Sequence, residues 1–184
     1  MSKLNLWRTI CLVGIFCALA VIGSPAGNFT TLVSFNGTDG GFPSGTLIQG
    51  LNGNFYGTTA EGGADTAACG GTGCGNVFAI TSGGKLTTLH TFDVTEGNTP
   101  VAGLMLATNG NFYSTTSQGG AHLAGTVFEI TAGGKLTTLH SFDGTDGANP
   151  QGLVQANNGN FYGTTFGGGA HDVGAVFEIT AGAS

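Results

Sequence analysis

The side chains best suited to chemistry are carboxylates in short Gly-rich segments. DGTDG at 143–147 holds Asp143 and Asp146, and the related NGTDG at 36–40 holds Asp39. Hard cations such as Ca²⁺ prefer clustered carboxylate and carbonyl oxygens. The EF-hand spacing is absent, however, and Asp and Gly are also common turn residues. The three aspartates are therefore candidate calcium ligands, with turn formation as the alternative.

Histidines occupy equivalent places in a second repeated segment. His122 and His171 both follow Gly-Gly-Ala, Asp65 takes that place in the first copy, and Asp172 follows His171 directly. In a closed ring the three equivalent positions would be related by symmetry and could converge on a metal ion or a ligand. A loop histidine is otherwise a solvated side chain. These four residues are the candidates for a binding face.

Two other pairs of residues favour structural roles. His90 and His140 stand where the first copy has Val33, which predicts packing rather than ligation. Cys69 and Cys74 are the two cysteines beyond residue 26. A structural zinc site needs about four ligands, so we expect a small disulfide formed in an oxidising compartment.

Catalytic motifs are absent from the sequence. No G-x-S-x-G elbow, H-E-x-x-H, Walker loop or paired zinc knuckle occurs. A nucleophile, base and acid need unique residues, whereas most polar residues here recur by repetition. An acid pair for glycoside hydrolysis could be drawn from the loops, but acids are too numerous there for such a pair to be informative. We expect no enzyme, and no cofactor beyond the calcium ion considered above.

Residues 1–26 have the pattern of a secretory signal peptide. Lys3 and Arg8 precede an apolar run over 10–22, and small residues follow. That run suits a signal h-region better than a spanning helix, which needs roughly 20 residues. The protein is therefore expected to be secreted or extracellular; an uncleaved N-terminal anchor is the alternative.

The net charge of the chain after residue 26 limits the classes of molecule that it can bind. Lys85 and Lys135 face all 10 acidic residues, two positive charges against ten negative, so the net charge becomes −8. Nucleic acid and anionic lipid both attract basic surfaces. We therefore expect no nucleic-acid partner; a glycan or a cell-surface component remains open.

Three near-identical units make up residues 27–184, which we expect to be one domain. FTTLVSF, LTTLHTF and LTTLHSF begin at 29, 86 and 136, and NGNFYGTT-type octets begin at 52, 109 and 158. NVFAIT, TVFEIT and AVFEIT begin at 76, 126 and 175. The repeats thus span about 29–85, 86–135 and 136–184, and the stretch with both cysteines is an insertion in the first.

Each unit is expected to form four short antiparallel strands, labelled a to d, and no helix. In the third copy, strands a, b and c are 152–156, 160–165 and 175–180, and strand d is clearest one copy earlier at 136–142. The Asn-Gly of each octet predicts a type I′ turn between a and b. Phe and Tyr of the octet alternate, so both can pack between stacked sheets. The segment 29–35 is expected to be a strand d that pairs with strand c of the last copy.

Four-stranded units at this period predict an all-β, β-propeller-like fold. Three blades are fewer than the usual four to eight. The chain is therefore either a fragment of a longer array or half of a homodimeric six-bladed ring; a three-fold β-trefoil or β-prism is the alternative.

The pattern GNFYGTT…GG…GTVFEIT…GGKLTTLHSFDGTDGANP resembles the Gloeo–Verruco (GloVer) tandem repeat of choice-of-anchor bacterial proteins. The likeness covers about residues 29–184. It implies an exported, surface-held bacterial protein with a propeller-like fold, no established activity and no catalytic residues to transfer. The chain shows no sorting anchor before Ser184, which is consistent with a fragment.

Strand order places the longer loops at one end of every unit. The d–a loops are 36–45, 93–103 and 143–152, the b–c loops are 60–75, 117–125 and 166–174, and together they hold most of the acids. Function is expected at this end. The sequence favours a secreted module for extracellular binding or surface structure. The alternatives are a truncated propeller of a larger sensor or enzyme, and a calcium-stabilised glycan-binding module.

Overall fold

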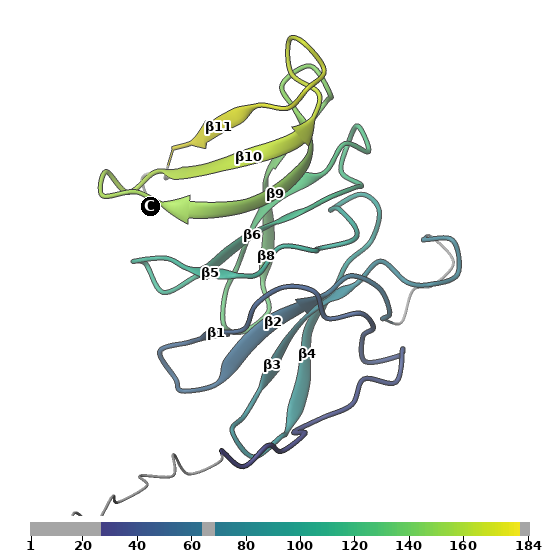
Figure 1. Cartoon of the computed structure of the whole chain (residues 1–184), viewed down its shortest axis with the longest axis vertical. Helices are drawn as coiled ribbons and strands as arrows, with labels where there is room; N and C mark the ends of the chain where they lie inside the picture. Colours follow the sequence, from purple (N-terminus) through teal and green to yellow (C-terminus); the bar gives the residue numbers. More distant parts are fainter. Residues whose placement is uncertain (1–26, 64–68, 181–184) are drawn as a thin grey trace, which may run out of the picture. The chain divides into compact units, whose positions relative to one another are not determined.

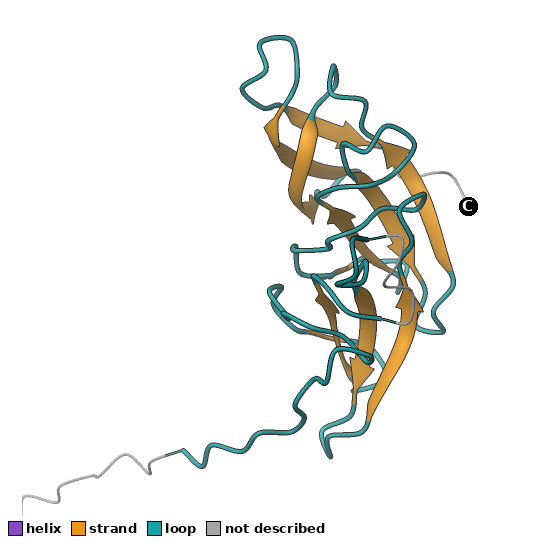
Figure 2. Cartoon of the chain, turned by 90° about the vertical axis from the view of Figure 1, so that its right-hand side faces the viewer, coloured by secondary structure: helices purple, strands orange, loops and turns teal. Residues whose placement is uncertain are grey.

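The structure is a computed structural model that describes residues 27–63 and 69–180. Residues 31–184 form one compact unit, and the account below concerns that unit. Its described part consists of strands and loops (Figure 2). None of the described residues belongs to a helix long and apolar enough to cross a membrane. The predicted signal segment 1–26 lies outside the described residues.

Three antiparallel sheets follow one another along the chain, each with its strands in chain order, and the last strand of the first two sheets comes from the start of the next repeat (Figure 1). The first sheet contains β1 (Ile48–Gln49), β2 (Phe55–Thr59), β3 (Asn76–Ile80) and β4 (Leu86–Thr91). The second contains β5 (Met105–Leu106), β6 (Phe112–Thr116), β7 (Thr126–Ile130) and β8 (Leu136–Ser141). The third contains β9 (Ala148–Gln155), β10 (Phe161–Gly167) and β11 (Val176–Ile179). This succession of meanders confirms the all-β, propeller-like fold.

The hairpins differ from the predicted type I′ turns. In the second copy, the amide of Gly110 donates to the Ala107 carbonyl and the amide of Ala107 donates to the Asn111 carbonyl, which defines a three-residue loop. Gly110 has φ +83°, whereas Asn109 is not among the residues with positive φ. A type I turn followed by one left-handed Gly satisfies this geometry. The prediction of two positive φ values was therefore wrong, because only the Gly needs one.

The Asn of each octet instead fixes the strand that follows. Asn109 accepts from the Asn111 amide at 3.1 Å and donates to the Tyr113 hydroxyl at 2.8 Å. Asn52 and Asn158 make the same two bonds in the other copies, to Tyr56 and Tyr162. The octet therefore closes a hairpin and anchors the tyrosine that packs between sheets.

Aromatic side chains pack between neighbouring sheets as predicted. Tyr56 stacks on Phe112 with ring centroids 4.2 Å apart, and Tyr113 stacks on Phe161 at 4.1 Å. A second set of rings meets edge to face, with Phe92 against Phe128 at 5.2 Å. Offset and edge-to-face arrangements are the favoured geometries for aromatic pairs. The core is thus formed by side chains that pack between neighbouring sheets.

The segment 31–35 does not form the predicted strand. It makes no ladder with β11, and among the described residues the third sheet has three strands. Phe35 nevertheless meets Phe78 edge to face at 5.1 Å, as Phe92 meets Phe128. The segment therefore lies where a preceding strand d would lie, but no described strand pairs with it to make a ladder.

Candidate binding face at the loop end

The predicted loops are joined by backbone hydrogen bonds. In the first copy, Gly41 and Glu61 exchange amide-to-carbonyl bonds of 2.8 and 3.2 Å. Asn98 and Gln118 do the same in the second copy, at 2.8 and 3.2 Å. In the third copy β9 begins at Ala148, so part of the predicted 143–152 loop is strand. We call the d–a and b–c loops together the loop end.

The candidate calcium ligands act as turn acceptors. Asp143 accepts from the Thr145 amide at 2.8 Å, the Thr145 hydroxyl at 2.7 Å and the Asp146 amide at 3.2 Å. The hydroxyl bond, supported by the two amide bonds, lowers the pKa of the Asp143 carboxyl to about 2. Asp146 in turn accepts from the Asp143 amide at 3.0 Å.

The same turn recurs in the other copies. Asp93 accepts from the Thr95 hydroxyl at 2.6 Å, and its pKa is likewise lowered, chiefly by that bond. In the first copy Asn36 is the acceptor, and Asp39 accepts from the Asn36 amide at 2.9 Å. A neutral amide thus replaces a carboxylate in one copy, so the turn itself needs an oxygen acceptor rather than a charge.

No group of three or more His, Cys, Asp or Glu side chains in the described residues is arranged to hold a metal ion. The structure keeps Asp39 in the first copy's turn and Asp143 with Asp146 in the third copy's turn. Calcium binding by these residues remains a prediction.

Two histidine–acid pairs were not predicted from the sequence. His90 Nε2 lies 2.8 Å from Glu96 Oε2, and His140 Nε2 lies 2.7 Å from Asp146 Oδ2. Each ring also meets a phenylalanine edge to face, Phe92 at 5.3 Å and Phe142 at 4.8 Å. These contacts fit the predicted structural role of both histidines. An acid six residues after each histidine is the sequence signal that could have revealed the pairs.

The predicted face residues lie at exposed loop tips. His122 and His171 are exposed, and neither makes a hydrogen bond or ion pair with another described residue. Asp172 is exposed with φ +56°, and accepts from the Gly168 amide at 3.2 Å. Asp65 lies outside the described residues. Within the described part, no hydrogen bond or ion pair joins any two of these four candidates.

Large apolar side chains are exposed beside these candidates. Leu123 follows His122 and is 66% exposed, and Val173 follows Asp172 and is 80% exposed. Phe166 and Phe42, also at the loop end, are 78% and 72% exposed. Leu123 and Phe42 have φ of +62° and +53°, a left-handed conformation uncommon for such residues. The backbone thus presents apolar and ionisable groups together.

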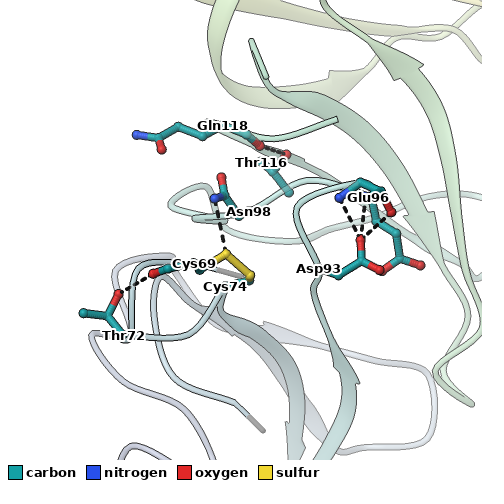
Figure 3. The surroundings of a disulfide bond; sticks show 9 residues. Cys69, Thr72, Cys74, Asp93, Glu96, Asn98, Thr116 and Gln118 are labelled. Carbon is teal, nitrogen blue, oxygen red and sulfur yellow. Dashed lines mark hydrogen bonds between the residues drawn. A yellow bond between two sulfur atoms is a disulfide. The ribbon is translucent and has the colours of Figure 1, made fainter. Parts of the chain in front are cut away.

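The predicted disulfide between Cys69 and Cys74 is present, with Cα atoms 5.3 Å apart (Figure 3). Asn98 Nδ2 lies 3.4 Å from Cys69 Sγ, and the Thr99 amide donates to the Cys74 carbonyl at 3.0 Å. The disulfide therefore fixes the insertion against the d–a loop of the next unit.

Acids outside the loop end belong to a network on the sheets. Glu129 Oε1 accepts from the Tyr113 hydroxyl at 2.7 Å and from Asn111 Nδ2 at 2.6 Å. Burial, together with the Glu129 bond, raises the pKa of Tyr113. The bonds from Tyr162 and Asn160 lower the pKa of the equivalent Glu178. These acids stabilise octets and leave the loop end as the candidate face.

Sequence comparison now identifies the family. Residues 19–177 match the Gloeobacter/Verrucomicrobia repeat, so the chain belongs to this repeat family. No curated protein matches the chain.

Solved structures similar to this chain include a streptogramin B lyase, at 17% identity and a TM-score of 0.48 over 76% of this chain and 41% of that one. Virginiamycin B lyase from Staphylococcus aureus is another, at 18% identity and a TM-score of 0.46 over 78% of this chain and 42% of that one. The chain thus spans about two fifths of the length of these lyases.

Proposed function

We propose that this β-repeat protein is a secreted, non-catalytic module that binds an extracellular glycan through the loop end. The observation that carries the proposal is the exposure of Leu123 next to His122, of Val173 next to Asp172, and of Phe166 in the same copy as Val173. Exposed apolar groups gathered with polar ones are typical of interaction sites. An aromatic face and nearby hydrogen-bonding groups together complement a sugar ring, which is apolar on its faces and polar at its rim.

The histidines that have acid partners favour a structural role over catalysis. His90 and His140 each use Nε2 to contact an acid, and neither hydrogen-bonds a Ser, Thr or Cys side chain in the described residues. A base that activates a nucleophile needs that contact. Family membership is in keeping with this role, because the matched repeat carries no enzymatic implication.

Screening against immobilised bacterial polysaccharides and an oligosaccharide array tests the proposal. We expect Phe166→Ala to weaken binding of the retained glycan at least tenfold. The matched control is Leu51→Ala, because Leu51 is 86% exposed but lies in a hairpin away from the loop end. Retention of no glycan, or equal losses in the two variants, would overturn the proposal.

A further inference from the structure

The third sheet exposes a face that the first two sheets bury. Val77 and Val127, at equivalent positions on β3 and β7, are both 0% exposed. Val176, the equivalent residue on β11, is 80% exposed, and Val154, which lines the same groove from β9, is 63% exposed. The same side chains are thus covered by a following sheet in two copies and uncovered in the third.

The first sheet has an exposed face at the other end of the molecule, and this face lacks a ring to stack on its octet phenylalanine. Between sheets, a tyrosine from one octet stacks on the phenylalanine of the next, in Tyr56–Phe112 and Tyr113–Phe161. Among the described residues, no ring stacks on Tyr162 or on Phe55. One end of the unit therefore offers the tyrosine half of the stack, and the other end offers the phenylalanine half.

Both end faces are apolar grooves. Leu153, Val154, Tyr162 and Val176 line the groove on the third sheet. Leu47, Phe55, Phe78 and Ile80 line the groove on the first. No charged residue in the described part lines either groove. Contact between the two grooves would bury apolar surface without leaving an unpaired charge buried.

The strand edges match as well as the faces. Segment 31–35 lies against the first sheet as β4 lies against the second: the Leu32 carbonyl approaches Gly84, and the Leu89 carbonyl approaches Gly134. Among residues 27–63 and 69–180, this segment has no ladder partner and β11 has one unpaired edge. In the first two sheets that edge is filled by β4 and β8.

We propose that the third-sheet face of one copy docks on the first-sheet face of a second copy of this chain. Tyr162 of the first copy then stacks on Phe55 of the second copy. Segment 31–35 of the second copy adds to β11 of the first copy as a fourth strand. Two such contacts close a head-to-tail pair, which removes both exposed sheet edges. A second copy is the occupant because the contact continues the interface that already joins the sheets within one chain.

The register of the docked strand follows from the repeat. Val77 is opposite His90, and Val127 is opposite His140. Val176 takes the place of Val127, and Val33 takes the place of His90 in the repeat. Val176 of one copy therefore lies opposite Val33 of the other.

Mass measurement in solution tests the association directly, on the chain as a secreting host releases it. We expect twice the mass of one chain, and a single-chain mass for Val176→Lys. Val173→Lys is the matched control, because Val173 is also 80% exposed but lies at the loop end. A single-chain mass for the unsubstituted protein would overturn the proposal, as would an unchanged mass for Val176→Lys.

A pair of cysteines tests the register of the docked strand and leaves most of the apolar contact between the two copies in place. In the variant Val33→Cys with Val176→Cys, mild oxidation should give a two-chain product on non-reducing electrophoresis. Leu51→Cys with Val176→Cys is the control and should remain single-chain. A bond formed within one chain, or no bond, would overturn the proposal. Glycan binding through the loop end is independent of either result.

Discussion

Asp143 shows how one side chain organises a turn in each copy. Its carboxylate accepts from the Thr145 hydroxyl and from two successive amides. Asp93 makes the same set in the second copy, and Asn36 makes it in the first. Side chains of this kind satisfy backbone donors that neither sheet nor helix would satisfy.

Replacement of Asp143 should change how stability depends on pH. A carboxyl pKa of about 2 in the folded protein lies below the ordinary value, so the charged form stabilises the fold. That contribution is present above about pH 4, the ordinary Asp pKa, and is lost as the pH falls through about 2. Asp143→Asn keeps an oxygen acceptor, so its melting temperature should fall less between pH 4 and pH 2 than that of the unsubstituted protein.

Circular dichroism melts at several pH values would measure this difference. Asp143→Ala, which has no acceptor at any pH, should melt lower than Asp143→Asn throughout. If the unsubstituted protein and Asp143→Asn had superimposable profiles, the turn carboxylate would not be responsible for acid lability.

For single residues, the sequence predicted the kind of role better than the side chains that each residue contacts. The disulfide was predictable because Cys69 and Cys74 were the only pair beyond residue 26. The contacts of His90 with Glu96 and of His140 with Asp146 were missed, because the d–a loop has to turn back on its strand before the two side chains meet. The exposure of Phe166 was also missed: the sequence placed it in a loop, whereas it lies near the end of β10 with its side chain 78% exposed.

Hairpin loops with one left-handed Gly are the repeated element of this fold. The a–b loop and the c–d loop use the same pair of backbone bonds, as at Ala107–Asn111 and Thr131–Lys135. The c–d loop of the second copy also approaches the neighbouring sheet, because a Cβ added at Gly134 would meet the Leu89 carbonyl oxygen. One loop type therefore serves both chain reversal and sheet packing.

Alanine substitutions should separate these two uses of glycine. Gly159 and Gly134 have φ of +87° and +89°, but an added Cβ at Gly159 meets nothing within 4 Å, whereas at Gly134 it meets the Leu89 carbonyl oxygen. Gly159→Ala should lower the free energy of unfolding by about 1–2 kcal/mol through left-handed strain alone. Gly134→Ala should lower it by roughly a further 1–3 kcal/mol through overpacking.

Urea unfolding of the two variants would measure both values. Equal losses would mean that the neighbouring sheet yields to the added methyl group, and that the c–d loop has no packing role.

At the element scale, strand positions were predictable because β-branched and aromatic residues recur between Gly and Asn. The hairpin type was not, because Asn-Gly fits both the two-residue I′ loop and the three-residue loop. The first-sheet tyrosine shows which one this chain needs, since Asn52 must keep negative φ while it donates to Tyr56. Segment 31–35 was mispredicted as a strand, because no described strand pairs with it.

At the scale of the whole unit, stability resides between sheets. Phe128 is 0% exposed and packs against Phe92 of the preceding sheet. Apolar burial of this kind is the dominant favourable contribution to folding. Neighbouring sheets should therefore unfold together rather than one by one.

Phe128→Ala should lower the free energy of unfolding by about 3–5 kcal/mol, the usual cost of a large cavity. Leu51→Ala is the control and should change it by less than about 0.5 kcal/mol, because Leu51 is 86% exposed. Far-UV and near-UV circular dichroism should give coincident transitions in the variant. Separate transitions would mean that the sheets are not coupled through this core.

The propeller-like architecture was predictable from the period and the four strands of each unit. The exposure of individual side chains on the last sheet was not, because periodicity describes what the copies share, whereas exposure at Val176 depends on which copy a residue occupies.

The Tyr–Phe stack between sheets has a consequence for how such a gene can lengthen. Each unit carries the tyrosine on one face and the phenylalanine on the other, so a tandem duplication of the coding segment inserts a unit that already fits both neighbours. The new junction needs no compensating substitution, and the terminal surfaces keep their chemistry. Repeat number can therefore change by unequal recombination without loss of the packing between sheets.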